Sequence, residues 1–156
     1  MSDFKKCLQE KVVKFGDDFA RKNEIGTLFG IERMPIMRGS VKIDRDGVPA
    51  LIWWPNNPGE VQEWIDIKEV YGTEYDSRGY QEVLQISETN TDPEENQRHI
   101  EATFANEYSQ TRYVFWHESH RGTCWYKFYG VYMLMREKTQ ETGKCWFERV
   151  ATQVEL

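Results

Sequence analysis

The sequence predicts an α+β domain built on a curled antiparallel or mixed β-barrel of six or seven strands, with an N-terminal helix and one mid-chain helix. Three observations predict it. Short apolar–polar alternating runs follow one another from residue 41 onward. Tight-turn signals join them, and helical spacing of apolar residues is confined to two places. A parallel sheet needs a helix after most strands, so pairing should be mainly antiparallel.

A single domain covering residues 1–156 fits this chain length, because two halves would each be marginally stable. Apolar residues recur three or four positions apart from Phe4 to Phe19, which predicts an amphipathic helix within residues 1–24. Ser2 is a suitable N-cap, and Asn23 and Gly26 offer a stop. The helix is expected to pack on a barrel formed by residues 38–156, and a partner helix is the alternative.

Strands dominate the rest of the chain. Asp46-Gly47 is a strong two-residue hairpin signal, and Asp92-Pro93 followed by two acids is a good helix start. Arg136–Gly143 reads as a polar hairpin loop. The expected strands are 41–45, Pro49–Trp54, a strand from Trp64 that Gly72 ends, Tyr80–Ile86, Arg112–Glu118, Trp125–Met135 and Lys144–Ala151.

The composition is that of a soluble protein, with 39% hydrophobic and 29% charged residues. No stretch approaches the roughly 20 apolar residues that span a bilayer, so no membrane association is expected. Met1–Lys14 lacks an apolar secretory core, and three sparse cysteines suit a reducing compartment. A cytoplasmic location is the resulting expectation.

The charge is uneven along the chain. Residues 51–110 hold thirteen Asp and Glu but three Lys and Arg, whereas both ends are near neutral. Nucleic-acid binders usually carry the opposite sign, although a local basic face can act on an acidic protein. This acidic middle region therefore keeps open an alternative function: an inhibitor related to phage or bacterial defence that binds a protein partner by mimicking nucleic acid.

Residues 113–132 hold eight of the 22 aromatic residues. Rings at this density can form a slot in which a flat ligand stacks. Trp53-Trp54 precedes a Pro- and Asn-rich loop, and because neighbouring strand residues face opposite sides, one of the two rings should reach a surface or pocket. The loop from Tyr71 to Tyr80 adds three tyrosines with Asp76 and Arg78, which suits a planar ligand.

Two metal hypotheses also arise. His117, His120 and Cys124 are residue types that bind zinc, but their spacing matches no standard zinc finger, so no metal site is assigned. Asp66-Ile67-Lys68 has the acid-x-Lys pattern of metal-dependent nucleases, which leaves a nuclease as a second alternative. The sequence has no complete catalytic signature and no cofactor motif, so we expect a protein that binds rather than catalyses.

The run Tyr126-Lys127-Phe128-Tyr129-Gly130-Val131-Tyr132 resembles the hallmark strand of SRA domains, which belong to the PUA-like superfamily. A helix bearing Gln97 and Asn106, a strand at Arg112–His117 and a closing strand at Lys144–Val150 extend the resemblance over residues 94–151. The resemblance implies a barrel that holds a modified base flipped out of DNA between aromatic rings. The first half departs from the family, because its glycine-rich opening and Asp–His–Gly element are missing.

We therefore expect a non-enzymatic module that stacks a modified nucleobase or nucleotide in a barrel pocket, with no cofactor. Its partner would be a nucleobase or modified DNA. Rings would come from Trp53 or Trp54, Tyr75 and Trp116, while Asp76 would read a base edge. The basic residues, including Arg112, would contact phosphate. The predicted ligand-binding set is Trp53, Trp54, Tyr75, Asp76, Arg78, Trp116, His117, Arg121 and Lys127.

Overall fold

The structure, a computed structural model, describes residues 2–34, 39–57, 62–120 and 123–156, and it confirms the α+β class. Within these ranges the helices are α1 (Phe4–Glu10), α2 (Lys22–Leu28), α3 (Pro93–Ala105) and α4 (Arg136–Thr142), with a 3-10 turn η1 (Glu107–Ser109). The strands are β1 (Val12–Lys14), β2 (Asp18–Phe19), β3 (Ser40–Arg45), β4 (Val48–Trp53), β5 (Trp64–Tyr75), β6 (Gln81–Asn90), β7 (Thr111–His120), β8 (Thr123–Leu134), β9 (Cys145–Ala151) and β10 (Gln153–Glu155).

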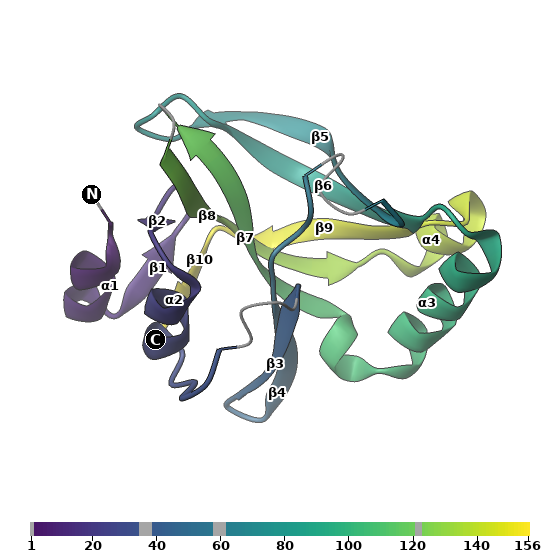
Figure 1. The fold of residues 1–156 in the computed structure, drawn as a ribbon, viewed down its shortest axis with the longest axis horizontal. Helices are drawn as coiled ribbons and strands as arrows, with labels where there is room; N and C mark the ends of the chain where they lie inside the picture. Colours follow the sequence, from purple (N-terminus) through teal and green to yellow (C-terminus); the bar gives the residue numbers. More distant parts are fainter. Residues whose placement is uncertain (1, 35–38, 58–61, 121–122) are drawn as a thin grey trace.

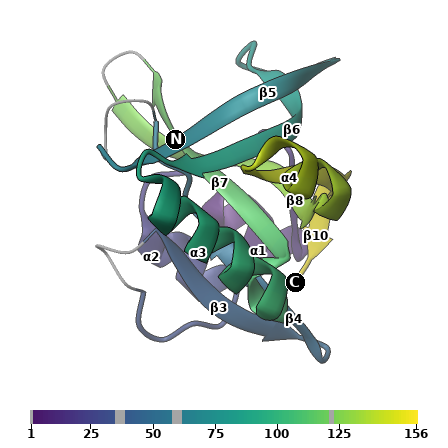
Figure 2. The ribbon, with the colours of Figure 1, turned by 90° about the vertical axis from the view of Figure 1, so that its right-hand side faces the viewer.

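The main sheet is mixed and strongly curved. Its order is β3-β4-β7-β8-β9-β6-β5, with β2 beside β8, and every pair is antiparallel except β4 with β7. Seen from the side of α3, β5 and β6 lie above, β3 and β4 lie below, and α3 stands between them (Figure 2). In the described residues β3 and β5 end the sheet and do not pair with each other, so a closed barrel is not confirmed.

Gly130 is one point at which the sheet bends. Its φ is 134°, and a Cβ there would come within 2.6 Å of the Ala151 carbonyl oxygen. The pairing register shifts beside it, between Val114 and Phe115 and between Val131 and Tyr132. Bulges of this kind bend and twist a strand, so the glycine in the aromatic run is required by the backbone.

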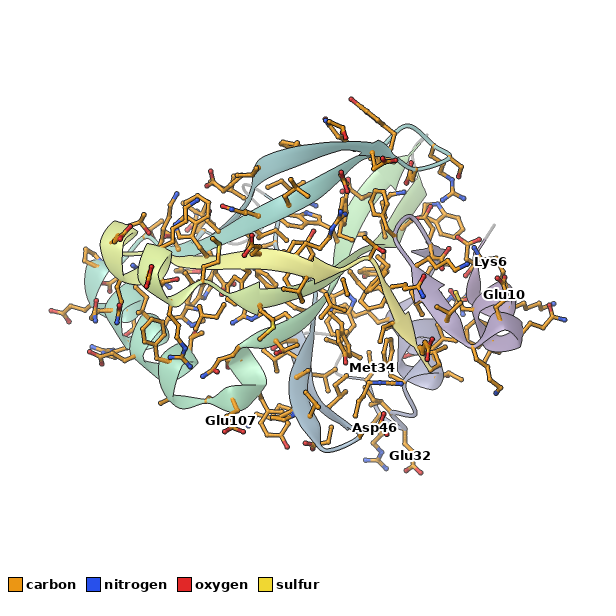
Figure 3. The ribbon with its side chains drawn as sticks, turned by 180° about the vertical axis from the view of Figure 1, so that it is seen from behind. Lys6, Glu10, Glu32, Met34, Asp46 and Glu107 are labelled. Atoms are coloured by element: carbon orange, nitrogen blue, oxygen red, sulfur yellow. The ribbon has the colours of Figure 1, made fainter. Side chains whose placement is uncertain are left out.

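The predicted helix across residues 1–24 is wrong beyond its first turns. α1 ends at Glu10, because Lys11 adopts a left-handed φ of 56° and Gly16 follows at 94°. The next apolar residues lie on short strands: Val13 on β1, which pairs with β10, and Phe19 on β2, which pairs with β8. Both are fully buried. Figure 3 shows Lys6 and Glu10 on the short α1 at one edge of the molecule, and Lys6 pairs with Asp17 of the turn between β1 and β2.

Local signals elsewhere predict the structure well. The β3–β4 hairpin turns at Asp46 and Gly47, with φ of 52° and 79°. α3 begins where expected, and the Asp92 side chain accepts from the Glu94 amide at 3.0 Å. The predicted loop at 136–143 is wrong, because these residues form α4. Buried Thr139 holds this helix on β9 by accepting from the Trp146 amide at 3.0 Å.

Two apolar clusters fill the domain. Phe115 and Phe128 lie in one, and Trp116, Tyr129 and Tyr132 lie in the other. The aromatic run of β7 and β8 therefore supplies both faces of the sheet. Its density is explained by core packing. Among the described residues, no helix is long and apolar enough to cross a membrane.

Candidate functional site

A cavity of about 310 Å³ lies where the curled sheet meets α3. Its wall includes residues of β4 near one end of the sheet, of β5 and β6 at the other end, and of β7 and α3 (Figure 1). Ligand cavities in proteins are commonly about 300 Å³ or larger, so the volume of this cavity suits one small ligand or one chemical group of a larger ligand. The curl of the sheet is what brings these separate strands together.

Three tryptophans line the cavity. Trp53 ends β4, Trp54 follows it, and Trp64 begins β5. The indole N–H of Trp54 is buried and has no hydrogen-bond partner in the described structure. Trp64 is partly exposed and packs edge-on against the His99 ring, with centroids 4.6 Å apart. The cavity therefore has flat apolar walls, and Trp64 is the most exposed of the three rings.

Glu88 of β6 is the centre of the polar wall. Its Oε1 lies 2.7 Å from Nε2 of His99 and accepts from Nη1 of Arg112 at 3.2 Å. Arg112 is also buried, with its guanidinium over the rings of Trp53 and Phe147 at 4.5 and 4.2 Å. A carboxylate held by two cationic groups stays fixed in place, so Glu88 offers an oriented acceptor.

Asp66 lies behind this wall and is fully buried. Its Oδ2 accepts from the Asn56 amide at 2.7 Å, and no donor in the described structure reaches its Oδ1. Burial raises the pKa of Asp66, and the neighbouring Glu88 raises it further. Burial would also raise the pKa of Glu88, but Arg112 and His99 outweigh it and hold that pKa low. The pair therefore carries one proton, on Asp66.

His99 completes the charge pattern. Burial by itself would lower the pKa of His99, but contacts with the Cys145 thiol and with Glu88 raise it to about 9. The imidazole is thus charged at neutral pH and donates to Glu88. With Arg112 also charged, this end of the cavity carries two cationic groups around one carboxylate and one neutral acid.

Of the predicted site residues, the structure places Trp53 and Trp54 at the cavity. Tyr75 stands at the far end of β5 and is 60% exposed. Asp76 binds the backbone amides of Arg78 and Tyr80, at 2.9 and 2.8 Å. Tyr75, Asp76 and Arg78 therefore belong to the tip of the β5–β6 hairpin.

Lys127 and Arg78 are committed to a second charged cluster. Lys127 is 1% exposed, forms an ion pair with Asp76 and lies 3.5 Å from Asp18 of β2. Arg78 pairs with the same Asp18. We call Asp18, Asp76, Arg78 and Lys127 the hairpin cluster. Its contacts join β2, β8 and the β5–β6 hairpin, which is a structural role.

Trp116 is 1% exposed and packs against Tyr129, with ring centroids 6.3 Å apart. The His117 ring stacks on the Tyr126 ring, with ring centroids 4.8 Å apart. Arg121 lies outside the described residues. The side chains of His120 and Cys124 lie outside them as well, so the predicted zinc ligands are not described together. Among the residues that are described, no group of three His, Cys, Asp or Glu is arranged to hold a metal.

Asp66 and Lys68, the nuclease hypothesis, lie on β5, with Asp66 enclosed and Lys68 paired with Glu118. The acidic middle region is also less acidic at the surface than its sequence indicates, because Asp66, Glu82 and Glu88 are buried. Its charge count therefore overstates the acidic face available to a protein partner.

Trp64, Glu88 and His99 were not expected in the site. Trp64 was assigned to a strand only, and nothing local marks Glu88 or His99, since they meet through the tertiary fold. Arg112 was expected to contact phosphate, but it is enclosed. The one sequence signal for a polar site in this region was Asp66, an acid between the apolar residues Ile65 and Ile67 of a predicted strand.

The family model of the SET and RING associated domain, SRA, matches residues 6–156. The chain belongs to the SRA family. The resemblance seen in β8 is thereby confirmed, and it extends over the first half of the chain as well.

Among solved structures, the SRA domain is similar to "The 5-Hydroxymethylcytosine-Specific Restriction Enzyme AbaSI", with a TM-score of 0.73 and 18% identity. The match covers 97% of this chain and 44% of that one, so this domain spans less than half of the enzyme's length. At this identity the similarity shows a common fold. No curated protein matches the sequence.

Proposed function

We propose that this SRA domain is a non-enzymatic reader of modified DNA that takes one modified cytosine, flipped out of the duplex, into the cavity. The observation that carries the proposal is the combination of tryptophan rings with the fixed carboxylate of Glu88 in one cavity of about 310 Å³. Membership of the SRA family supports it. So does the name of AbaSI, which is described as specific for 5-hydroxymethylcytosine.

Stacking supplies the affinity in this proposal. A base turned out of the helix loses its stacking on its neighbours, and aromatic side chains replace it. Such stacking is worth about 1–3 kcal/mol per base. Trp64 is the best placed ring, because it lines the cavity and is still partly exposed.

Glu88 supplies the choice of base. Cytosine carries an exocyclic amine, which donates, where thymine and uracil carry a carbonyl oxygen, which accepts. His99 and Arg112 hold Glu88 ionised, so it can accept from the amine and would repel the carbonyl. A polar substituent on the base would meet the donor groups of Arg112 and His99, which line the same cavity.

The test is a fluorescence anisotropy titration at low salt with duplexes of one sequence. The central base is cytosine, 5-methylcytosine, 5-hydroxymethylcytosine or thymine. We expect a modified-cytosine duplex to bind best and the thymine duplex to bind no better than non-specific DNA. Equal affinity for all four duplexes would overturn the proposal.

Trp64→Ala tests the stacking wall. Loss of one stacking ring should weaken binding of the preferred duplex by about 1–3 kcal/mol, roughly 5- to 150-fold, in the same titration. Trp125→Ala is the matched control, because Trp125 is also partly buried but lies beside Arg78 at the hairpin cluster. If both variants lose affinity equally, the cavity is not the site.

A further inference from the structure

The loop that follows β4 is fastened at two consecutive residues. The backbone amide of Asn56 donates to Asp66 Oδ2 on β5 at 2.7 Å. The side chain of Asn57 then turns to β7, where its amide group donates to the His117 carbonyl at 2.7 Å and its Oδ1 accepts from the indole N–H of Trp116. A short segment is thus held between two strands of the sheet.

The anchor on β7 is itself rigid. Trp116 is 1% exposed, with the ammonium of Lys68 4.8 Å from its ring centroid. Lys68 also forms an ion pair with Glu118, and its ammonium donates to the Tyr129 hydroxyl at 3.1 Å. The indole that holds Asn57 therefore cannot turn without breaking a packed polar cluster.

The same segment forms part of the cavity wall. Trp54 and Asn56 both line the cavity, and Asn57 follows them directly with its side chain on β7. A binding wall that is already fixed avoids the entropy cost of ordering on binding. Asn57 itself is not among the cavity-lining residues, so its contacts with β7 can act on the wall only through its neighbours in the chain.

We propose that Asn57 is a positioning residue: by bridging Trp116 and the His117 carbonyl, it fixes Trp54 and Asn56 in the geometry that distinguishes a modified base. The inference rests on the proposed function for its consequence in DNA binding, while the bridge itself is testable without DNA. It also gives Trp116 a role through its N–H, acting on the wall rather than stacking on the base.

The bridge is tested first, on the free protein. Indole N–H signals are recorded in ¹H–¹⁵N spectra, and Trp116→Phe assigns the signal of Trp116. In Asn57→Ala that signal should move upfield and exchange faster with solvent, because its acceptor is gone. An unchanged Trp116 signal would overturn the proposal whatever the domain binds.

Binding is tested next, with the duplexes used for the proposed function. Asn57→Ala should weaken the preferred modified duplex about tenfold, the size expected for two ordinary hydrogen bonds, and leave the unmodified duplex unchanged. Asn57→Asp keeps the acceptor for Trp116 but faces the His117 carbonyl with a carboxylate, so it should not restore the preference. Trp116→Phe should lose less affinity for the preferred duplex than Asn57→Ala, because it removes one of the two hydrogen bonds.

Trp146→Phe is the matched control. It removes an indole N–H that donates to Thr142 at 2.8 Å on α4, away from the loop after β4. Trp146→Phe should keep the full preference of the wild type for the modified duplex over the unmodified one. Urea unfolding of each variant separates positioning from folding: affinity lost equally for both duplexes, in step with stability, would overturn the inference. Wild-type protein with no preference among duplexes would instead overturn the proposed function and leave the spectroscopic result standing.

Discussion

The domain contains two buried charged clusters that differ in one respect. In the hairpin cluster, two carboxylates face two cations, and Lys127 lies between Asp18 and Asp76. In the cavity cluster, Glu88 interacts with both His99 and Arg112. Each cluster keeps one buried carboxylate oxygen without a hydrogen-bond partner in the described structure, Asp18 Oδ1 in the first and Asp66 Oδ1 in the second. The difference is that Glu88, His99 and Arg112 line the cavity, whereas no residue of the hairpin cluster does.

The difference shows how a binding site is told from a structural contact. Burying charge is costly unless partners are supplied, so the ion pairs of the hairpin cluster stabilise a junction between strands. Charged groups that also line a cavity can contact a ligand as well as each other. Both clusters contain residues of the types that bind nucleotides, and the sequence does not separate them, because the position of a cavity is a property of the fold.

Lys127→Met gives the largest expected effect. Removing the cation leaves Asp18 and Asp76 buried near each other, which should cost about 3–5 kcal/mol of unfolding free energy in urea titrations. Lys144→Met is the control, since Lys144 and its partner Glu69 are 3.2 Å apart but partly exposed, and it should cost under about 1 kcal/mol. Similar losses in the two variants would show that the hairpin cluster has no special structural role.

The pH dependence of stability tests the cavity cluster. The folded state binds a proton at His99 more tightly than the unfolded state, with a pKa of about 9 against an ordinary value of 6.5. Its contribution is therefore complete below about pH 6.5 and lost as the pH rises through 9, by about 3 kcal/mol in total. Asp66, whose pKa is also raised, changes stability in the same direction.

The measurement is urea unfolding of the wild type at about pH 6 and about pH 9.5. His99→Gln retains a donor for Glu88 but does not titrate, so its stability should change less between the two conditions. A wild type equally stable at both would contradict the charged state assigned to His99.

Asp66→Asn gives the smallest loss. Asp66 is neutral in the folded state but ionised in the unfolded chain near neutral pH, so the amide replaces it in shape and charge without the cost of taking up a proton. The unfolding free energy near neutral pH should therefore stay the same or rise. Asp76→Asn, the same change in the hairpin cluster, removes an ionised partner of Lys127 and should cost clearly more. If Asp66→Asn is the more damaging of the two, the proton does not reside on Asp66.

The sequence predicts those parts of the fold that depend on neighbours along the chain. Asp46-Gly47 fixes the β3–β4 turn, and Asp92-Pro93 fixes the start of α3. The helix expected through Phe19 failed because apolar spacing of three and four also fits two short strands separated by a turn at Gly16. That choice was decided by pairing with strands β8 and β10.

The site was predictable only in part. Because adjacent strand residues face opposite ways, one of Trp53 and Trp54 was expected in the core and the other at a surface or pocket. Both line the cavity, and both are largely buried. Glu88 and His99 come from β6 and α3, and no spacing rule connects them. Tyr75 looked equally suitable in the sequence, yet it stands on an exposed hairpin tip.

The pairing of β1 with β10 places the last strand beside the segment that follows α1, with Val12 opposite Glu155. Both chain ends lie on the side of the molecule away from α3 (Figure 1). A fluorophore, an affinity tag or a fused catalytic module joined at either end would leave from that side. Because Trp64 and His99 lie at the α3 end of the molecule, either attachment would leave the cavity open to solvent.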